Sequence, residues 1–286
     1  RPAGPAAGRS RRSGLRVGSG GAVLLLGSAA GRPVVLRVAA QDGPGDPRPT
    51  ADPLRRLRAA GVRRVPEVLG TGTHDGLAWT VETRLPGTTA GRLTPALLTQ
   101  VADFCATLPP TGGPPAVPPL TATGRTHLPG LVDGLARVED VLAAGLPALP
   151  GVIGHGDLWA GNLLVEGDAL TGVVDWDACH DGAVPGTDVL HAVATDDRMR
   201  HHRSLGAELL ARPWHDGPTA ALLVAAWARA GLDLSPARQD LVGLAWWARQ
   251  VTAALTRTPA LAADRQWVRQ NVEAVLDAWR AVLAAP

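Results

Sequence analysis

Gly154-His-Gly-Asp-Leu-Trp-Ala-Gly-Asn162 is the most informative segment of the sequence, together with Thr171-Gly-Val-Val-Asp-Trp-Asp177 shortly after it. The first segment places a carboxylate at Asp157 and an amide at Asn162. The second delivers the Asp175 carboxylate at the end of a short apolar run. Phosphoryl transfer needs such groups, because a carboxylate must orient and deprotonate the attacking hydroxyl while oxygen ligands hold Mg²⁺ on the nucleotide phosphates.

The amino-terminal part of the chain has the pattern of a small β-rich lobe. Glycine-rich turns separate its apolar runs, and Asp52 followed by Pro53 is typical of a helix start. Arg84-Leu-Pro-Gly87 has the composition of a turn that leaves this lobe. Three apolar runs predict the strands of an antiparallel meander, namely Leu15–Val17, Ala22–Leu26 and Pro33–Ala39. Two later runs also have strand character, namely Val65–Leu69 and Leu77–Val81.

The rest of the chain is mostly helical in its pattern. Leu163–Val165 and Val173–Val174 flank a short turn and predict a paired hairpin. The sequence therefore predicts an α+β, two-lobed fold, with a β-rich lobe at 1–87, whose residues 1–12 form a flexible arm, and a larger helical lobe at 88–286. Helical spacing is found in Pro95–Leu108, Leu128–Ala144, Pro218–Ala230, Pro236–Leu255 and Ala262–Ala284.

The composition excludes several classes of protein. With 286 residues, 45% hydrophobic and 19% charged, the chain is globular rather than disordered. All 28 basic residues are Arg, so mechanisms that require a lysine Schiff base or a P-loop lysine are excluded. Cys105 and Cys179 are too few for a disulfide framework or a cysteine-based metal site.

The net charge of +2 is unevenly distributed. Residues 1–64 carry 13 Arg against three Asp, whereas residues 65–286 carry 15 Arg against 23 acidic residues. This distribution is consistent with a site for a phosphate-bearing ligand. It is equally consistent with a basic amino-terminal tail on a protein whose surface is otherwise ordinary. Because no aromatic residues interleave with the first arginines, we expect no nucleic-acid partner. No apolar run reaches the length of a membrane span or a signal peptide, so we expect no membrane partner and a cytoplasmic location.

The opening stretch matches a known pattern. His155-Gly-Asp157 with Asn162 matches H-G-D-x-x-x-x-N, and Asp175-Trp-Asp177 matches a metal-binding D-x-D segment. In these motifs, and in their order along most of the chain, the sequence resembles the aminoglycoside phosphotransferase and choline kinase-like family, which shares the protein-kinase fold. The resemblance implies an ATP- and Mg²⁺-dependent enzyme that phosphorylates a hydroxyl of a small molecule, such as an aminoglycoside, sugar, amino alcohol or other natural product.

The resemblance also implies a role for individual residues. Asp157 would be the catalytic base, and Asn162 and Asp175 would be Mg²⁺ ligands. The nucleotide would be held by residues of the first lobe, which are Gly18, Ser19, Gly20 and Gly21 in the phosphate-covering loop, Arg37 on the third strand, Asp52 on the following helix, and Glu82 and Thr83 beside the adenine.

Other polar and aromatic residues near these motifs are expected to have structural roles. We expect His155 to brace its loop through hydrogen bonds rather than to transfer protons, and Asp188 to hold local backbone. The tryptophans of the helical segments, Trp227, Trp246 and Trp247, are expected in the core rather than at a substrate platform.

Two departures from the family pattern leave an alternative open. The family has Lys where this chain has Arg37, and Glu where it has Asp52. Arg is bulkier and forked, although a longer Arg with a shorter Asp could preserve the ion pair. Arg37 favours a pseudokinase that binds a nucleotide or a partner, whereas the intact Asp157, Asn162 and Asp175 favour the enzyme. The sequence leaves open the acceptor, ATP against GTP, the oligomeric state, and whether the chain is a fragment.

Overall fold

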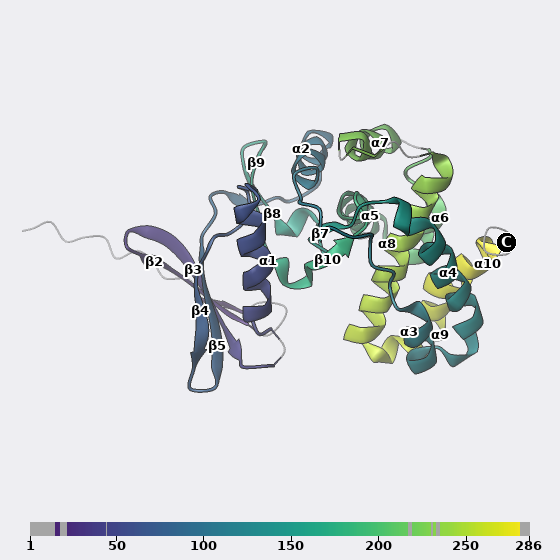
Figure 1. Ribbon diagram of the computed structural model, residues 1–286, viewed down its shortest axis with the longest axis horizontal. Helices are drawn as coiled ribbons and strands as arrows, with labels where there is room; N and C mark the ends of the chain where they lie inside the picture. The colour runs from purple at the N-terminus through teal and green to yellow at the C-terminus, as the bar shows by residue number, and fades with distance from the viewer. Residues whose placement is uncertain are drawn as a thin grey trace, which may run out of the picture. The chain divides into compact units, whose positions relative to one another are not determined.

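The computed structural model describes residues 15–17, 22–43, 45–216, 219–229, 231–232 and 235–280. The chain divides into an amino-terminal unit, Arg1–Arg56 with Pro66–Leu85, and a carboxy-terminal unit, Leu57–Val65 with Pro86–Pro286. Figure 1 shows a sheet in the first and mostly helices in the second, which confirms the predicted fold class. The arm expected at 1–12 lies outside the described residues.

The amino-terminal unit is built on an antiparallel sheet. Its strands are β1 (Leu15–Val17), β2 (Val23–Ala29), β3 (Arg32–Ala40), β4 (Val68–His74) and β5 (Leu77–Thr83), in the order β1-β2-β3-β5-β4. Ala30-Gly31 joins β2 to β3 and Asp75-Gly76 joins β4 to β5, and all four residues have positive φ. Two-residue turns of this kind match the twist of the paired strands. The pairing of β1, β2 and β3 confirms the predicted antiparallel meander, whereas the strand expected at Val65–Leu69 begins only at Val68 and extends to His74.

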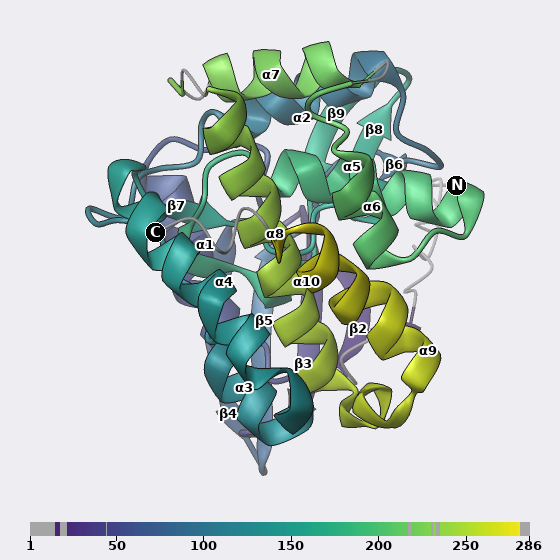
Figure 2. The same cartoon turned by 90° about the vertical axis from the view of Figure 1, so that its right-hand side faces the viewer.

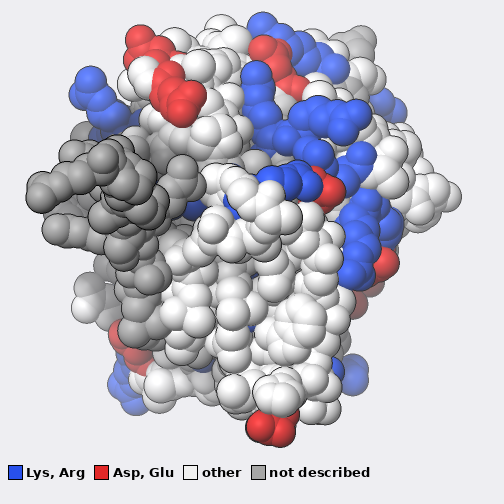
Figure 3. Space-filling view, turned by 90° about the vertical axis from the view of Figure 1, so that its left-hand side faces the viewer, with Lys and Arg blue, Asp and Glu red and all other residues white. Residues whose placement is uncertain are grey.

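The two faces of this sheet differ in character. One face buries Arg37 of β3 with Thr80 and Glu82 of β5, because alternate residues of paired strands share a face. The opposite face exposes apolar side chains, with Leu25 38% and Leu77 46% exposed. Among the atoms that face the viewer, Figure 3 shows a broad area without charged side chains.

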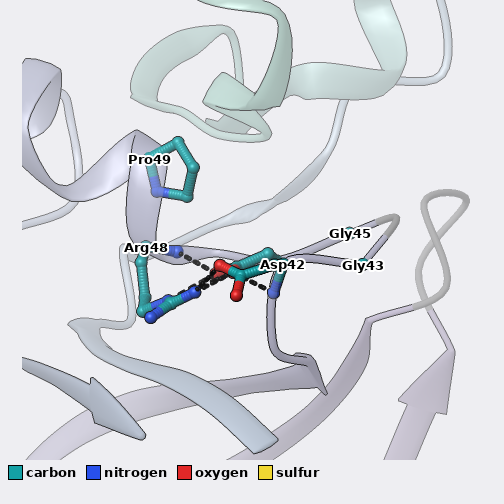
Figure 4. A pocket seen from close by; sticks show the side chains of 6 residues that line it. Asp42, Gly43, Gly45, Arg48 and Pro49 are labelled. Atoms are coloured by element: carbon teal, nitrogen blue, oxygen red, sulfur yellow. Dashed lines mark hydrogen bonds and ion pairs between the residues drawn. The ribbon is translucent and has the colours of Figure 1, made fainter.

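The helix α1 (Arg48–Ala59) begins four residues before Asp52, so the prediction that a helix starts at Asp52 and Pro53 was wrong. Asp46 instead accepts a hydrogen bond from the Arg48 backbone N–H at 2.9 Å, and Asp52 lies exposed inside the helix. The Arg48 guanidinium binds Asp42 at 2.6 Å (Figure 4). It also binds Asp46 at 2.6 Å, and this hydrogen bond holds the pKa of Asp46 well below the usual range. This loop borders an open pocket of about 530 Å³ lined by Asp42, Gly43, Gly45, Asp46, Arg48 and Pro49.

The carboxy-terminal unit is mainly helical. Its helices are α2 (Pro95–Cys105), α3 (Leu120–His127), α4 (Val132–Gly145), α5 (Thr187–His201), α6 (Leu205–Ala211), α7 (Ala220–Arg229), α8 (Pro236–Arg257), α9 (Arg265–Val268) and α10 (Ala274–Ala278). The helix α8 packs against α3, α4, α5 and α6 and lies at their centre in Figure 2. Trp246 and Trp247 of α8 and Trp227 of α7 are almost fully buried, as predicted for core residues.

Two of the predicted helices differ in extent from the observed ones. The long helix expected at Ala262–Ala284 is interrupted by a π-helical turn at Arg269–Glu273, which separates α9 from α10. The helix expected from Leu128 begins at Val132, after a short 3₁₀ turn. None of the helices within the described part of the chain is long and apolar enough to cross a membrane.

Short strands position the motif-bearing loops of this unit. The strands β6 (Thr88–Thr89), β8 (Leu163–Glu166) and β9 (Ala169–Val173) form a sheet in the order β6-β8-β9, and β7 (Val152–Gly154) pairs with β10 (His180–Ala183). Leu163 pairs with Val173, which confirms the predicted hairpin. Because this hairpin starts after Asn162 and ends before Asp175, its pairing brings those two residues to the same end of the two strands.

Candidate active site

The loop from Gly154 to Asn162 is anchored by a buried carboxylate. Asp188, in the first turn of α5 and 6% exposed, accepts hydrogen bonds from two successive backbone N–H groups. Its Oδ2 lies 2.8 Å from the His155 nitrogen and its Oδ1 lies 2.9 Å from the Gly156 nitrogen. The backbone immediately before Asp157 is therefore fixed by α5, in agreement with the role expected of Asp188 from the sequence.

Gly156 occupies a position that only glycine fits. Its φ is +81°, and a Cβ atom there would collide with the carbonyl oxygen of Ala178. The same Cβ position lies 3.1 Å from the Arg249 guanidinium, which donates a hydrogen bond to the Ala178 oxygen at 3.1 Å. The loop thus passes in close contact with the segment after Asp175, and the close approach requires a residue without a side chain.

His155 braces this loop. Its ring is fully buried against Trp176, with ring centroids 4.6 Å apart. Nδ1 accepts a hydrogen bond from the Asp157 backbone N–H at 3.3 Å, so the proton resides on Nε2, which donates to the Val174 oxygen at 2.9 Å. Burial lowers the pKa of His155. The neutral, doubly hydrogen-bonded ring agrees with the bracing role expected from the sequence.

The Asp157 side chain is held at one oxygen and open to solvent at the other end. Its Oδ1 lies 3.2 Å from Nε2 of His191 on α5, and 40% of the side chain is exposed. The hydrogen bond from His191 lowers the pKa of Asp157, and the charge of Arg257 on α8 acts in the same direction. Asp157 is therefore an ionised carboxylate at neutral pH, as a general base must be.

Asn162 and Asp175 provide oxygen donors at the end of the β8–β9 hairpin. The Asn162 amide nitrogen donates to the Asp157 carbonyl oxygen at 2.8 Å, which turns the amide oxygen away from that bond. The Asn162 carbonyl accepts from the Val174 N–H at 2.9 Å, so Asp175 follows directly after the residue bonded to Asn162. Asp175 has a left-handed backbone (φ 62°, ψ 62°) and is exposed.

This donor set fits a nucleotide-bound Mg²⁺. Mg²⁺ is usually held by one or two protein oxygens together with substrate phosphates and water. Asn162 and Asp175 supply that number of hard oxygen donors. Among the described residues, no cluster of three or more His, Cys, Asp or Glu side chains could hold a metal ion by itself.

The nucleotide-binding residues expected in the amino-terminal unit have mixed outcomes. Arg37 and Glu82 form a buried ion pair, with Nη1 and Oε1 3.9 Å apart, and Thr80 donates to the same carboxylate at 3.2 Å. Glu82, rather than the exposed Asp52, is thus the carboxylate found beside Arg37, which corrects the predicted pair. The Thr83 hydroxyl accepts from the Glu67 N–H at 2.9 Å.

The site residues expected from the sequence fall into three groups. Asp157, Asn162 and Asp175 come together in the carboxy-terminal unit, whereas the amino-terminal unit contains Arg37, Asp52, Glu82 and Thr83. The remaining group, Gly18, Ser19, Gly20 and Gly21, lies outside the described residues.

Sequence reasoning did not identify His191. It follows Asp188 by one helical turn, so both side chains face the same loop, and this spacing was a signal that could have been used.

Comparison with known proteins identifies the family and the fold of the chain. A model of the phosphotransferase enzyme family matches residues 13–195. No curated protein matches the chain. Among solved structures, aminoglycoside phosphotransferase APH(4)-Ia is 18% identical, with 96% of this chain and 94% of that chain covered and a TM-score of 0.59. APH(3'')-Id from Streptomyces rimosus ATCC10970 is 18% identical, with coverages of 83% and 92% and a TM-score of 0.56.

Macrolide 2'-phosphotransferase MphH from Brachybacterium faecium is also 18% identical, with coverages of 91% and 92% and a TM-score of 0.54. At this level of identity the solved structures establish the kinase-like fold. The family match spans well over half of the chain and includes the two segments that carry Asp157, Asn162 and Asp175. The chain therefore belongs to the phosphotransferase enzyme family, as a small-molecule kinase with the kinase-like fold.

Proposed function

We propose that the chain transfers the γ-phosphoryl group of ATP, as its Mg²⁺ complex, to a hydroxyl group of a small molecule. The observation that carries the proposal is the half-exposed, ionised carboxylate of Asp157, in one loop with Asn162. Proteins of similar fold support it, since APH(4)-Ia has been solved with ADP and hygromycin B and APH(3'')-Id with ADP and streptomycin. Amino sugars, sugars, amino alcohols and other natural products are all candidate acceptors.

In this mechanism Asp157 is the general base. Its Oδ2 accepts the proton of the acceptor hydroxyl. As this proton leaves, the hydroxyl oxygen of the acceptor forms a bond to the γ-phosphorus, and the bond between the γ-phosphorus and the ADP oxygen breaks. Asn162 and Asp175 would hold Mg²⁺, which when bound neutralises charge on the phosphates. Asp188 and His155 keep the loop in place without contacting the reacting atoms.

The alternative function is a pseudokinase that binds a nucleotide or a partner without efficient transfer. The observation in its favour is Arg37, which stands where the family resemblance places Lys and which is buried beside Glu82. Arg cannot replace Lys without a change of shape, although it can bind phosphate. The two functions differ in whether Asp157 affects turnover, and this difference decides the experiment.

The experiment measures ADP formation from ATP in the presence of Mg²⁺ and one of three acceptors of similar size. The acceptors are an amino sugar, a sugar and an amino alcohol. We expect Asp157→Asn to lower turnover by roughly 10²- to 10⁴-fold with little change in nucleotide affinity. The matched control is Asp168→Asn, which alters an exposed carboxylate in the β8–β9 turn. Near-normal turnover in Asp157→Asn removes its role as base.

The pseudokinase is tested on the same proteins by calorimetry. If the wild-type protein consumes no ATP with any acceptor and binds ATP equally well with and without a chelator, the pseudokinase is favoured and Asn162 and Asp175 lose their role as metal ligands. If the phosphotransferase function is correct, Asp175→Ala weakens Mg²⁺-dependent nucleotide binding more than Asn162→Ala does, because the Asp175 variant also loses a charge.

A further inference from the structure

Three side chains from three different elements form a hydrogen-bonded chain that ends on Asp157. Trp246 of α8 donates its Nε1–H to Nδ1 of His191 on α5, at 3.3 Å. His191 Nε2 lies 3.2 Å from Oδ1 of Asp157 in the loop after β7. The chain joins a core helix to the carboxylate, and the pattern H-G-D-x-x-x-x-N contains neither Trp246 nor His191.

The direction of these hydrogen bonds follows from the chemistry of indole. Trp can only donate, so Nδ1 of His191 must be the acceptor and cannot carry a proton. The proton of the neutral imidazole is therefore on Nε2, which donates to the Asp157 carboxylate. Thr195, one turn further along α5, places its hydroxyl 3.4 Å from the same Nε2. Trp246 thus selects the tautomer that His191 needs in order to bind Asp157.

Burial makes this arrangement rigid at one end and open at the other. Trp246 is 1% exposed and His191 5% exposed, whereas 40% of the Asp157 side chain is exposed. Among the described residues, Oδ1 of Asp157 has a hydrogen-bond partner in His191, and no partner is found for Oδ2. A carboxylate fixed through one oxygen presents the other in a defined direction, which is what a general base requires.

We propose that His191 and Trp246 are positioning residues, which hold the Asp157 carboxylate so that its Oδ2 accepts the proton of the acceptor hydroxyl. This inference rests on the proposed phosphotransferase function. His191 keeps its own proton throughout the step, because the proton released by the acceptor moves to Oδ2. The arrangement follows the logic by which a third residue orients a catalytic histidine, except that here the histidine orients the base.

The neighbouring Trp247 provides a matched control. It is also almost fully buried in α8, but its Nε1 donates to the Asn271 carbonyl at 2.8 Å, in a bond that does not reach Asp157. Trp246→Phe and Trp247→Phe each remove one indole N–H and a similar volume from the same helix. A loss common to both variants is therefore a packing effect, and a loss confined to Trp246→Phe belongs to the hydrogen-bonded chain.

The kinetic experiment uses the full chain with ATP, Mg²⁺ and the best acceptor of the panel. We expect Trp246→Phe and His191→Leu to lower kcat by roughly 10- to 100-fold while the KM for ATP is unchanged, because the base is misplaced and nucleotide contacts are not. His191→Gln, which can donate from nearly the same place, should recover most of the loss. Trp246→Phe should have no added effect in the His191→Gln background.

The pH dependence of kcat provides a second readout that packing alone does not move. His191 stabilises the ionised form of Asp157, so its loss should shift the acid limb of the profile to higher pH. Other charged and titratable groups around this loop include His155 in the loop itself, Asp175 after β9, Asp188 on α5 and Arg257 on α8, and all four are retained in the variants. Trp247→Phe should leave the acid limb in place.

A spectroscopic measurement tests the arrangement without catalysis, and so separates it from the proposed function. In protein labelled with ¹⁵N-histidine, the His191 ring is assigned among the eight histidines by its absence from His191→Gln. We expect its proton on Nε2 and a change in the Nδ1 resonance in Trp246→Phe but not in Trp247→Phe. A proton on Nδ1, or equal kinetic effects of the two tryptophan variants, would overturn the proposal even if phosphoryl transfer is confirmed.

Discussion

Replacing Asp188 by Ala should remove a large part of the free energy of unfolding of the carboxy-terminal unit. The carboxylate is 6% exposed and accepts the N–H groups of His155 and Gly156 at 2.8 and 2.9 Å. A hydrogen bond to a charged group contributes about 1.5–3 kcal/mol, so the loss of two should cost about 3–6 kcal/mol. A domain is stable by only about 5–15 kcal/mol, and this single change should therefore lower the urea midpoint strongly.

The assay is urea unfolding of the full chain followed by tryptophan fluorescence. Eight of the nine tryptophans lie in the carboxy-terminal unit, so the signal reports mainly on that unit. The control is Asp168→Ala, an exposed carboxylate in the β8–β9 turn, which should change stability by no more than about 0.5 kcal/mol. A loss below about 1 kcal/mol for Asp188→Ala would show that water replaces the carboxylate, and the argument that α5 anchors the loop would be refuted.

Three further predictions concern other parts of the molecule. Gly156→Ala should unfold at lower urea concentration and lose most activity, because its Cβ would collide with the Ala178 oxygen at positive φ. Wild-type activity in this variant would show that the close approach of Gly156 to Ala178 does not constrain the loop. Burial raises the pKa of Glu208 to about 7, so the contribution of this group to stability is present below pH 4.5 and is lost as the pH rises through 7. Glu208→Gln should remove this pH dependence. If the urea midpoint of the variant changes between pH 5 and pH 8 as it does in the wild type, this role of Glu208 is excluded. Arg37→Ala should weaken ATP–Mg²⁺ binding by about 1.5–3 kcal/mol if a charge-assisted phosphate contact is lost, and calorimetry that gives equal affinities for folded proteins would remove that role.

Local parts of the fold and of the site could be predicted from the sequence. Asp157 and Asn162 are five residues apart in one loop, and Asp175 follows a strand of the hairpin that begins after Asn162. The turns at Ala30-Gly31 and Asp75-Gly76 are likewise set by two residues each. These features depend on the φ preferences and hydrogen bonds of near neighbours, and such preferences are written in short stretches of sequence.

The partner of Arg37 could not be predicted in the same way. The order β1-β2-β3-β5-β4 places β5 directly beside β3, and the register puts Thr80 opposite Arg37 and Glu82 two residues further on the same face. Sequence order places α1 after β3, which led to the choice of Asp52. Strand order and register are decided by the packing of the whole sheet, so only the tertiary structure could identify Glu82.

The two-lobed fold class, the phosphotransferase loop and the oxygen donors expected to bind Mg²⁺ could all be predicted from the residues along the chain. The residues that hold the base are brought together by the folded chain, because His191 lies 34 residues from Asp157 and Trp246 lies 55 residues beyond His191. A hydrogen bond of about 3 Å cannot be predicted from sequence spacing when its two groups belong to elements far apart along the chain. Their meeting depends on how α5 and α8 pack in the core, and that packing is a property of the folded unit as a whole.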